Sequence, residues 1–212
     1  WRRQVTQRHL SLAAGGDLSA GRLLAAYRSA VFPWFSPGDP ILWWSPSQRM
    51  VLEPARVRVT RSLAKVLRNR AYHITINQAF EPVMRACAAP RGGQAGTWIT
   101  DEMVAAYSEL HRQGWAHSAE LRHKGQLLAG LYFVAIGQAV FGESMFTTVR
   151  DGSKLALCLL VDAARRHGVP LIDCQQNTRH LASLGAAELP RAQFVREMQA
   201  AQQGPAIDWS HE

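Results

Sequence analysis

The sequence lacks the short signatures of the common nucleotide-binding and metal-dependent enzymes. It has no G-x-G-x-x-G and no Walker loop, which argues against a dinucleotide or triphosphate site. It has no C-x-x-C, H-E-x-x-H or G-x-S-x-G, and His111, His117 and His123 share no metal-ligand spacing. We therefore expect no metal site, and any chemistry has to come from other polar residues.

Cysteine and long apolar runs are also scarce. The three cysteines lie in apolar stretches without close pairing, which favours free thiols in a reducing compartment. No apolar run approaches membrane-spanning length, and no signal peptide is visible, although the chain begins with Trp1 and not with Met. These features predict a cytoplasmic protein.

What the sequence does contain is an ordinary globular composition with a basic excess. Of its 212 residues 47% are hydrophobic and 19% are charged, enough for one large or two small domains. Lys and Arg number 24 against 16 Asp and Glu, which gives a net charge of +8. This charge favours an anionic partner such as nucleic acid or a membrane surface, and a solvated basic surface is the alternative.

The hydrophobic pattern divides the chain into a small N-terminal domain, residues 1–60, and a larger domain, residues 61–212. In the first, Ser19 is placed to cap a helix. The segment VFPWFSPGDPILWWSPSQR follows, where proline and glycine exclude regular helix. Early in the second domain several cations cluster on a short helix beginning at Ser62, which is either a phosphate contact or a wet face.

The larger domain carries the stronger structural patterns. Thr100 caps a helix with Asp101 and Glu102 in its first turn, and Gly114 ends it. From Trp115 three strands joined by short turns predict an antiparallel meander. The remaining expected elements are a helix over 153–167, a strand from Leu171, a short helix over 180–184 and a helix over 191–202. This order predicts an α+β fold with helices on a mostly antiparallel sheet.

Three polar residues stand where these strands should be apolar. Glu143 interrupts AVFGESMF, and Asp173 and Gln175 end PLIDCQ. Being two residues apart, Asp173 and Gln175 should point to one face of the strand, and an unpaired buried carboxylate is costly. Structural hydrogen bonding is the alternative, but three such positions in one unit favour a functional site. Cys174 between them is expected to be inert packing.

Longer motifs then resemble one family, in chain order. They are GGDLSAGRLLAAYRSAVFPWFSPGDPILWWSP, GTWIT, FGESMF, DGSKLAL and LIDCQQNTRHLASLGA, which extend over nearly the whole chain. These segments resemble the bacterial leucyl/phenylalanyl-tRNA–protein transferases. Two departures stand out: Phe133 replaces a usual glycine, where it can narrow a cleft, and the segment before Gly15 does not match.

The resemblance implies an aminoacyltransferase. Such an enzyme transfers Leu or Phe, and less readily Met, from aminoacyl-tRNA to the α-amino group of proteins that begin with Arg or Lys, which marks them for degradation. It implies a larger domain like the GNAT acyltransferase fold. It also implies no metal or diffusible cofactor, because the tRNA ester is already activated, and no membrane partner.

The same resemblance assigns roles to individual residues. Gln175 holds and orients the attacking amine, Asp173 supports Gln175 and draws off positive charge, and Glu143 completes an acidic pocket. The expected binding residues are Leu131, Met145 and Leu160 for the donor side chain, Trp34 and Trp98 for the terminal adenosine, and Arg61, Lys65 and Arg68 for tRNA phosphates. Ala64 stands where a typical family member has a lysine, which weakens the last contact.

Two other classes of protein remain open. An acetyl-CoA-dependent GNAT enzyme would need a glycine-rich turn for pyrophosphate between a strand and a helix, and VRDGSK does not supply it convincingly. A non-catalytic RNA-binding module would explain the charge and the tryptophans. It would leave Glu143, Asp173 and Gln175 without a reason.

Overall fold

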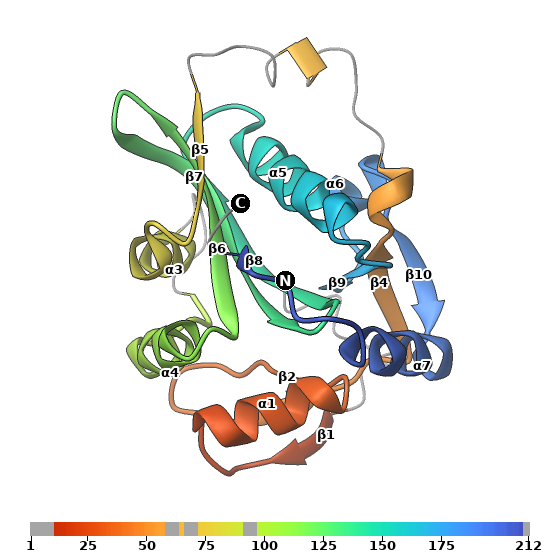
Figure 1. Ribbon diagram of the computed structural model, residues 1–212. Coiled ribbons are helices and arrows are strands. Elements are labelled where there is room, and N and C mark those ends of the chain that lie inside the picture. Colours follow the sequence, from red (N-terminus) through yellow and green to blue (C-terminus); the bar gives the residue numbers. More distant parts are fainter. Residues whose placement is uncertain (1–10, 58–63, 66–71, 91–96, 210–212) are drawn as a thin grey trace.

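The computed structural model describes residues 11–57, 64–65, 72–90 and 97–209. Within these residues the strands form two sheets, a small one of three strands and a large one of seven. The small sheet and its helix lie at the lower end of the large sheet in Figure 1. The predicted α+β class is confirmed.

The small unit is a helix packed on three short strands. It consists of β1 (Ser11–Ala14), α1 (Ala20–Arg28), β2 (Phe32–Pro33) and β3 (Leu42–Trp44), with strand order β1-β3-β2. Ser19 precedes α1 as expected, but its side chain makes no capping bond; instead Asp17 Oδ1 accepts a hydrogen bond from the Ser19 amide. Trp43 is buried and donates to the Gly15 carbonyl, which ties the sheet to the start of the unit.

The large sheet has the strand order β10-β4-β9-β8-β7-β6-β5. Its strands are β4 (Gln48–Leu52), β5 (His73–Ile76), β6 (Ala116–His123), β7 (Gln126–Ile136), β8 (Ala139–Thr147), β9 (Ile172–Gln175) and β10 (Ala187–Pro190). All neighbours are antiparallel except β8 and β9, which run parallel. The predicted meander is therefore present as β6, β7 and β8.

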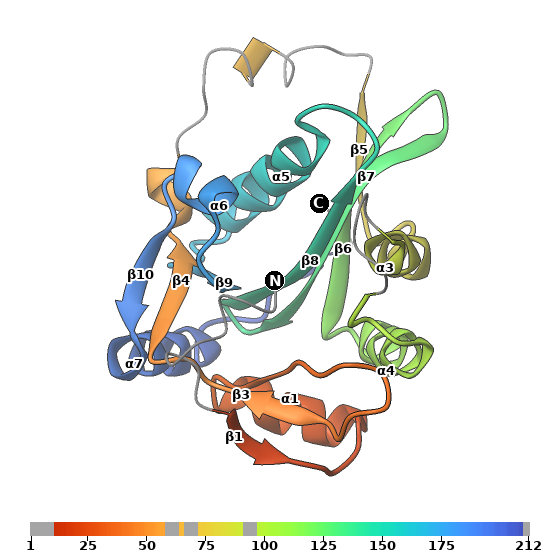
Figure 2. The ribbon, with the colours of Figure 1, turned by 180° about the vertical axis from the view of Figure 1, so that it is seen from behind.

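Helices cover both faces of the large sheet, as Figure 2 shows from behind. The helices are α3 (Phe80–Ala88), α4 (Asp101–Arg112), α5 (Gly152–Arg166), α6 (Arg179–Ser183) and α7 (Arg191–Gln202). One buried cluster unites α3, α4, α7 and the small unit, and a second lies under α5. The predicted cap of α4 is confirmed, because Thr100 Oγ1 accepts a hydrogen bond from the Met103 amide.

The division between the two units differs from the predicted boundary at residue 60. β4 precedes that boundary, yet it pairs with β9 and β10 inside the large sheet, so the sheets divide between Trp44 and Gln48. Proline and glycine in this region exclude helix but not short strands, and the pattern therefore missed β2, β3 and β4. None of the helices in the described ranges is long and apolar enough to cross a membrane.

Candidate active site

A cavity opens where β8 and β9 part. The two strands pair only at Val140 with Ile172 and at Phe141 with Asp173. At the next position, a Cβ on Gly142 would lie 3.2 Å from the Asp173 carbonyl, so the close approach of β9 favours glycine. Past this point the ends of both strands line a cavity of about 960 Å³. That volume lies in the range typical of small-molecule sites.

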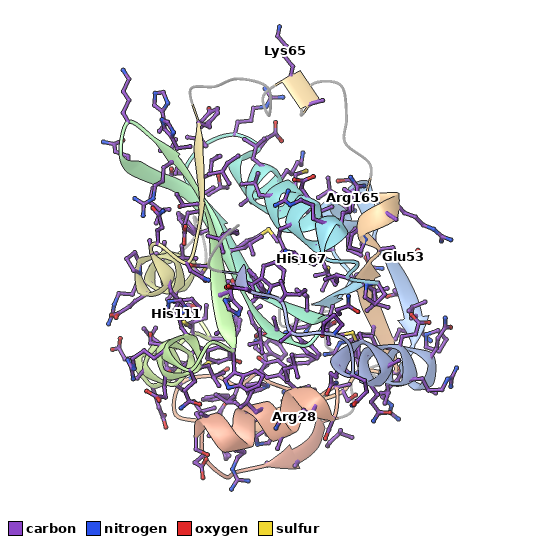
Figure 3. All side chains as sticks on the ribbon, in the orientation of Figure 1. Arg28, Glu53, Lys65, His111, Arg165 and His167 are labelled. Atoms are coloured by element: carbon purple, nitrogen blue, oxygen red, sulfur yellow. The ribbon has the colours of Figure 1, made fainter. Side chains whose placement is uncertain are left out.

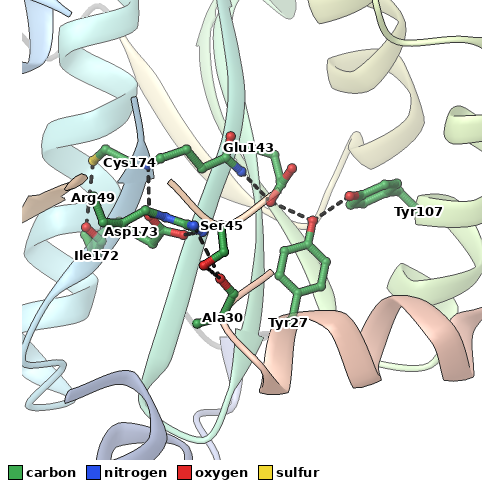
Figure 4. Close-up of polar contacts among 10 residues, drawn as sticks. Tyr27, Ala30, Ser45, Arg49, Tyr107, Glu143, Ile172, Asp173 and Cys174 are labelled. Atoms are coloured by element: carbon green, nitrogen blue, oxygen red, sulfur yellow. Dashed lines mark hydrogen bonds and ion pairs between the residues drawn. The ribbon is translucent and has the colours of Figure 1, made fainter. Parts of the chain in front are cut away.

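Glu143 faces this cavity because of a bulge in β8. The register between β7 and β8 shifts beside Tyr132, so β8 carries one extra residue there, which is Glu143. Bulges commonly re-aim a side chain next to an active site. Glu143 Oε1 accepts hydrogen bonds from the Tyr27 hydroxyl at 2.7 Å and from Gln175 Nε2 at 3.1 Å (Figure 4).

Two buried tyrosines lead to Glu143 from other parts of the chain. The Tyr107 and Tyr27 hydroxyls lie 2.5 Å apart. An ionised Glu143 can only accept, so Tyr27 donates its one proton to Glu143, and Tyr107 in turn donates to Tyr27. Burial, followed by the charge of Glu143, raises the pKa of both phenols, which keeps these protons in place. Sequence reasoning missed both tyrosines, because each lies on the apolar stripe of its helix.

The environment of Glu143 disfavours its charge. Burial raises its pKa from 4.5 to about 7, and the charge of Asp173 adds to the effect. The hydrogen bonds from Tyr27 and Gln175 and the charge of Arg49 act in the opposite direction. A carboxyl with this pKa changes charge near neutral pH, and a nearby cation would hold it ionised.

Asp173 lies beside the cavity in a buried ion pair. Arg49 Nε donates to Asp173 Oδ1 at 2.8 Å and Arg49 Nη2 to Oδ2 at 2.6 Å, and the two side chains are 1% and 0% exposed. The guanidinium carbon lies over the rings of Phe32 and Phe194, 4.6 Å from each centroid. Asp173 Oδ1 also accepts a hydrogen bond from the backbone N–H of Gln175 at 2.8 Å. Asp173 therefore contacts the backbone of Gln175.

The prediction that the side chains of Asp173 and Gln175 point to one face of the strand is wrong. Gln175 lines the cavity, whereas Asp173 does not. Gln175 has a φ of 60°, a left-handed conformation that is costly for a residue with a side chain, and its bond to Asp173 helps to hold it. Sequence reasoning missed Arg49. A signal was present, since Arg49 precedes three apolar residues of β4 that are buried.

The predicted binding residues fall into two groups. Leu131, Met145, Leu160, Trp34 and Trp98 all line the cavity together with Glu143 and Gln175. Lys65 is exposed and extends outward at the upper end of the molecule, on the connection between η1 (Pro54–Arg56) and β5 (Figure 3), and it does not line the cavity. Arg61 and Arg68 lie outside the described residues.

Two further expectations concern neighbours of the site. Phe133 is not among the residues that line the cavity; it packs edge-on against Trp209, with ring centroids 4.9 Å apart. Cys174 lines the cavity, but burial raises the pKa of its thiol far above neutrality, which makes it a poor nucleophile. In the described part of the chain no three His, Cys, Asp or Glu side chains are grouped to hold a metal ion.

A mostly antiparallel sheet covered by helices, with its cavity where two parallel strands part, is a GNAT-like architecture. The solved structure of FemX shares the fold, with a TM-score of 0.52 and 12% identity over 68% of this chain and 60% of that chain. The likeness at this identity concerns the fold alone.

Sequence comparison then identifies the family. The profile described as leucyl/phenylalanyl-tRNA protein transferase matches residues 51–199, and the profile of that family's N-terminal domain matches residues 16–47. The leucyl/phenylalanyl-tRNA–protein transferase of Nitrosomonas europaea is 56% identical over 187 residues, 88% of this chain and 79% of the relative. That of Paraburkholderia phytofirmans is 54% identical over 203 residues, 93% and 83% of the two chains. The chain belongs to the leucyl/phenylalanyl-tRNA–protein transferase family, which confirms the resemblance.

Proposed function

We propose that this enzyme transfers Leu or Phe, and less readily Met, from aminoacyl-tRNA to the α-amino group of proteins that begin with Arg or Lys. The observation that carries the proposal is the Glu143–Gln175 pair at the parting of β8 and β9, in a cavity with apolar residues and tryptophans around it. The amine nitrogen attacks the ester carbonyl carbon, a C–N bond forms, and the C–O bond to the terminal ribose breaks. The ribose oxygen leaves with a proton and the amine loses one.

Gln175 orients the amine in this reaction. Glu143 faces the Gln175 side chain and a carboxylate only accepts, so the nearer group is the NH₂ of Gln175. The carbonyl oxygen of Gln175 remains as an acceptor for the amine N–H. A carboxamide is a poor base, so the contribution of Gln175 is orientation.

Asp173 is a positioning residue in this proposal. Both of its oxygens are engaged by Arg49, and one of them also holds the Gln175 amide. Protonation of Asp173 would break a buried ion pair, which argues against a role as the proton acceptor. Glu143 lines the cavity and supplies its negative charge.

The walls of the cavity suit the rest of the donor. Leu131, Met145 and Leu160 offer an apolar surface to an unbranched Cβ, and methionine adapts to the shapes of Leu, Phe and Met. Trp34 and Trp98 offer faces for the terminal adenine, where stacking is worth ~1–3 kcal/mol per base. Lys65, which does not line the cavity, would contact tRNA phosphates together with Arg61 and Arg68.

The reaction needs no diffusible cofactor, because the ester of the tRNA is already activated. Aminoacyl-tRNA and acceptor proteins would be met in the cytoplasm, where tRNA is charged. Cys87, Cys158 and Cys174 form no disulfide within the described residues, which suits a reducing compartment. The product carries a new N-terminal residue that marks it for degradation.

A transfer assay tests the proposal. Labelled Leu from Leu-tRNA should appear on a peptide that begins with Arg, and not on the same peptide with an acetylated N-terminus or with Ala in the first position. Calorimetry with acetyl-CoA runs in parallel. Binding of acetyl-CoA without any labelling of the Arg peptide would replace this proposal with an acetyltransferase.

A further inference from the structure

Three buried side-chain polar atoms of cavity-lining residues have no hydrogen-bond partner among the described residues, the Tyr132 hydroxyl, Glu143 Oε2 and His180 Nε2, and the first two lie on the adjacent strands β7 and β8. The Tyr132 side chain is 0% exposed and its hydroxyl makes no hydrogen bond. Glu143 Oε2 is likewise buried and unpaired, although Oε1 of the same carboxylate accepts two hydrogen bonds. Both residues line the cavity. Because buried polar groups are normally satisfied, such a pair points to a ligand or a water molecule.

The two residues are neighbours on one face of the sheet. Glu143 is the bulged residue of β8 beside Tyr132 of β7. The Tyr132 ring is held edge-on by Tyr107 at 5.7 Å and by Phe80 at 6.1 Å between centroids. Burial, and then the charge of Glu143, raises the Tyr132 pKa, so its hydroxyl keeps its proton. The ring is fixed by packing while its oxygen is left available.

The charge of the cavity decides which ligand fits. Glu143 is the one carboxylate among the described residues that line it, and no described Lys or Arg side chain lines it. His180 also lines it, but burial lowers the pKa of its imidazole, which keeps it neutral near pH 7. An anion would therefore face an uncompensated carboxylate. A cationic N–H group would instead supply the donor that Oε2 lacks and would stabilise the ionised form of Glu143.

We propose that Tyr132 and Glu143 together bind a cationic N–H group of a substrate, with Glu143 Oε2 and the Tyr132 oxygen each accepting one hydrogen bond. This inference rests on the proposed function, which supplies two such groups: the α-ammonium of the aminoacyl ester and the basic side chain of the acceptor. The attacking amine is not a candidate, because it must be neutral to react.

The test is the substitution Tyr132→Phe, with two substrate pairs. The donor pair is Phe-tRNA and 3-phenyllactyl-tRNA, in which a hydroxyl replaces the α-ammonium. The acceptor pair is one peptide that begins with Arg and its analogue that begins with citrulline, which lacks the charge. Since a hydrogen bond to a charged group is worth about tenfold or more in affinity, one of the two kcat/KM ratios should fall about tenfold. A fall in the donor ratio assigns the site to the α-ammonium, and a fall in the acceptor ratio assigns it to the basic side chain.

A matched control separates this effect from stability. Ser108→Ala removes another buried hydroxyl without a partner among the described residues, from a residue that does not line the cavity, and both ratios should stay unchanged. Tyr132→Phe should not lower the melting temperature, because the ring remains and its hydroxyl makes no hydrogen bond within the described part of the protein. Glu143→Gln combined with Tyr132→Phe should cost less than the sum of the single changes, because one ligand group contacts both residues.

A binding measurement gives a readout without turnover. Calorimetry with 3′-phenylalanylamido-adenosine and its phenyllactyl analogue should show the same loss of preference in Tyr132→Phe if the donor ammonium is the ligand. The proposal is overturned if neither kcat/KM ratio changes. It is also overturned if kcat/KM falls equally for all four substrates, which is the result expected if the two atoms bind a water molecule or serve packing alone. Failure of the proposed function is a different result, since the wild type would then label no peptide.

Discussion

At the scale of single residues, the role of Asp173 follows from its neighbours. Arg49 engages both carboxylate oxygens, and the Gln175 amide bonds to one of them. Replacing Asp173 by Ala therefore does two things: it releases Gln175 and leaves a buried guanidinium without its counter-ion. Because both side chains of the pair are buried, this change should affect the stability of the fold as well as the site.

Substitutions at Asp173 and Gln175 separate orientation from stability. Gln175→Ala should lower kcat/KM by ~10²–10⁴, the usual cost of one oriented group, with little loss of stability. Asp173→Ala should also cost ~3–5 kcal/mol of unfolding free energy, because it leaves Arg49 unpaired. Asp173→Asn keeps an acceptor for the Gln175 amide and should recover part of the activity without changing the pH profile. If the Asn variant loses an ionisation from that profile, Asp173 is the proton acceptor after all.

Glu143 should make the stability of the enzyme depend on pH. Its pKa in the folded protein is about 7, above the ordinary 4.5, so between these values the folded state binds more protons than the unfolded state. Stability from this group is therefore lost as pH rises from about 4.5 through 7, by up to about 3 kcal/mol. Urea unfolding at several pH values should show a flatter profile for Glu143→Gln. Equal slopes in variant and wild type would contradict a raised pKa.

At the scale of secondary-structure elements, the site depends on where strands part and bulge. The turns, the Thr100 cap and the helical periodicity are local signals, so the meander and the helices α4, α5, α6 and α7 were predicted from the sequence. The parting of β8 and β9 depends on pairing between distant segments, and so does the Arg49–Asp173 pair, whose members are 124 positions apart. Such contacts leave little trace in local periodicity.

The cavity wall formed by β7, β8 and α5 should decide which amino acid is transferred. Leu131, Met145 and Leu160 line it, and they can exclude a branched Cβ only by crowding the atoms next to Cα. Met145→Ala should lower kcat/KM for Leu-tRNA by the equivalent of ~1–3 kcal/mol and reduce discrimination against Ile-tRNA. Met198→Ala is the matched control, since Met198 is buried on α7 and does not line the cavity. An unchanged Leu-to-Ile ratio in a folded Met145 variant would place the pocket elsewhere.

At the scale of the whole molecule, the net charge of +8 suits a long anionic substrate such as tRNA. Lys65 extends outward at the upper end of the molecule (Figure 3), and it is not among the residues that line the cavity. A tRNA whose terminal adenosine enters the cavity is long enough to reach that end as well. The chemistry and the electrostatic contact are therefore expected to be separable by mutation.

Removal of Lys65 and Arg68 should weaken tRNA binding and flatten its dependence on salt. The slope of log K against log salt should fall by roughly one unit for each phosphate that is no longer neutralised. Transfer from a short aminoacyl-nucleotide should change far less, because such a donor lacks the phosphates that these two cations would neutralise. Arg196→Ala on α7 removes an exposed arginine from a different part of the molecule and should leave the slope unchanged. Equal losses with both donors would mean that Lys65 and Arg68 do not contact tRNA.

The bonds between the two units have a consequence for how such an enzyme can diversify. The family profiles meet between residues 47 and 51, which suggests a natural joint for recombination. Yet two hydrogen bonds cross that joint: Tyr27 donates one to Glu143, and Arg49 donates one to the Ala30 carbonyl. A chimera that takes its first 47 residues from a distant relative would alter the protonation of Glu143 and the hold on Asp173 unless both contacts were restored. An exchange of one half that keeps activity would therefore have to keep both contacts.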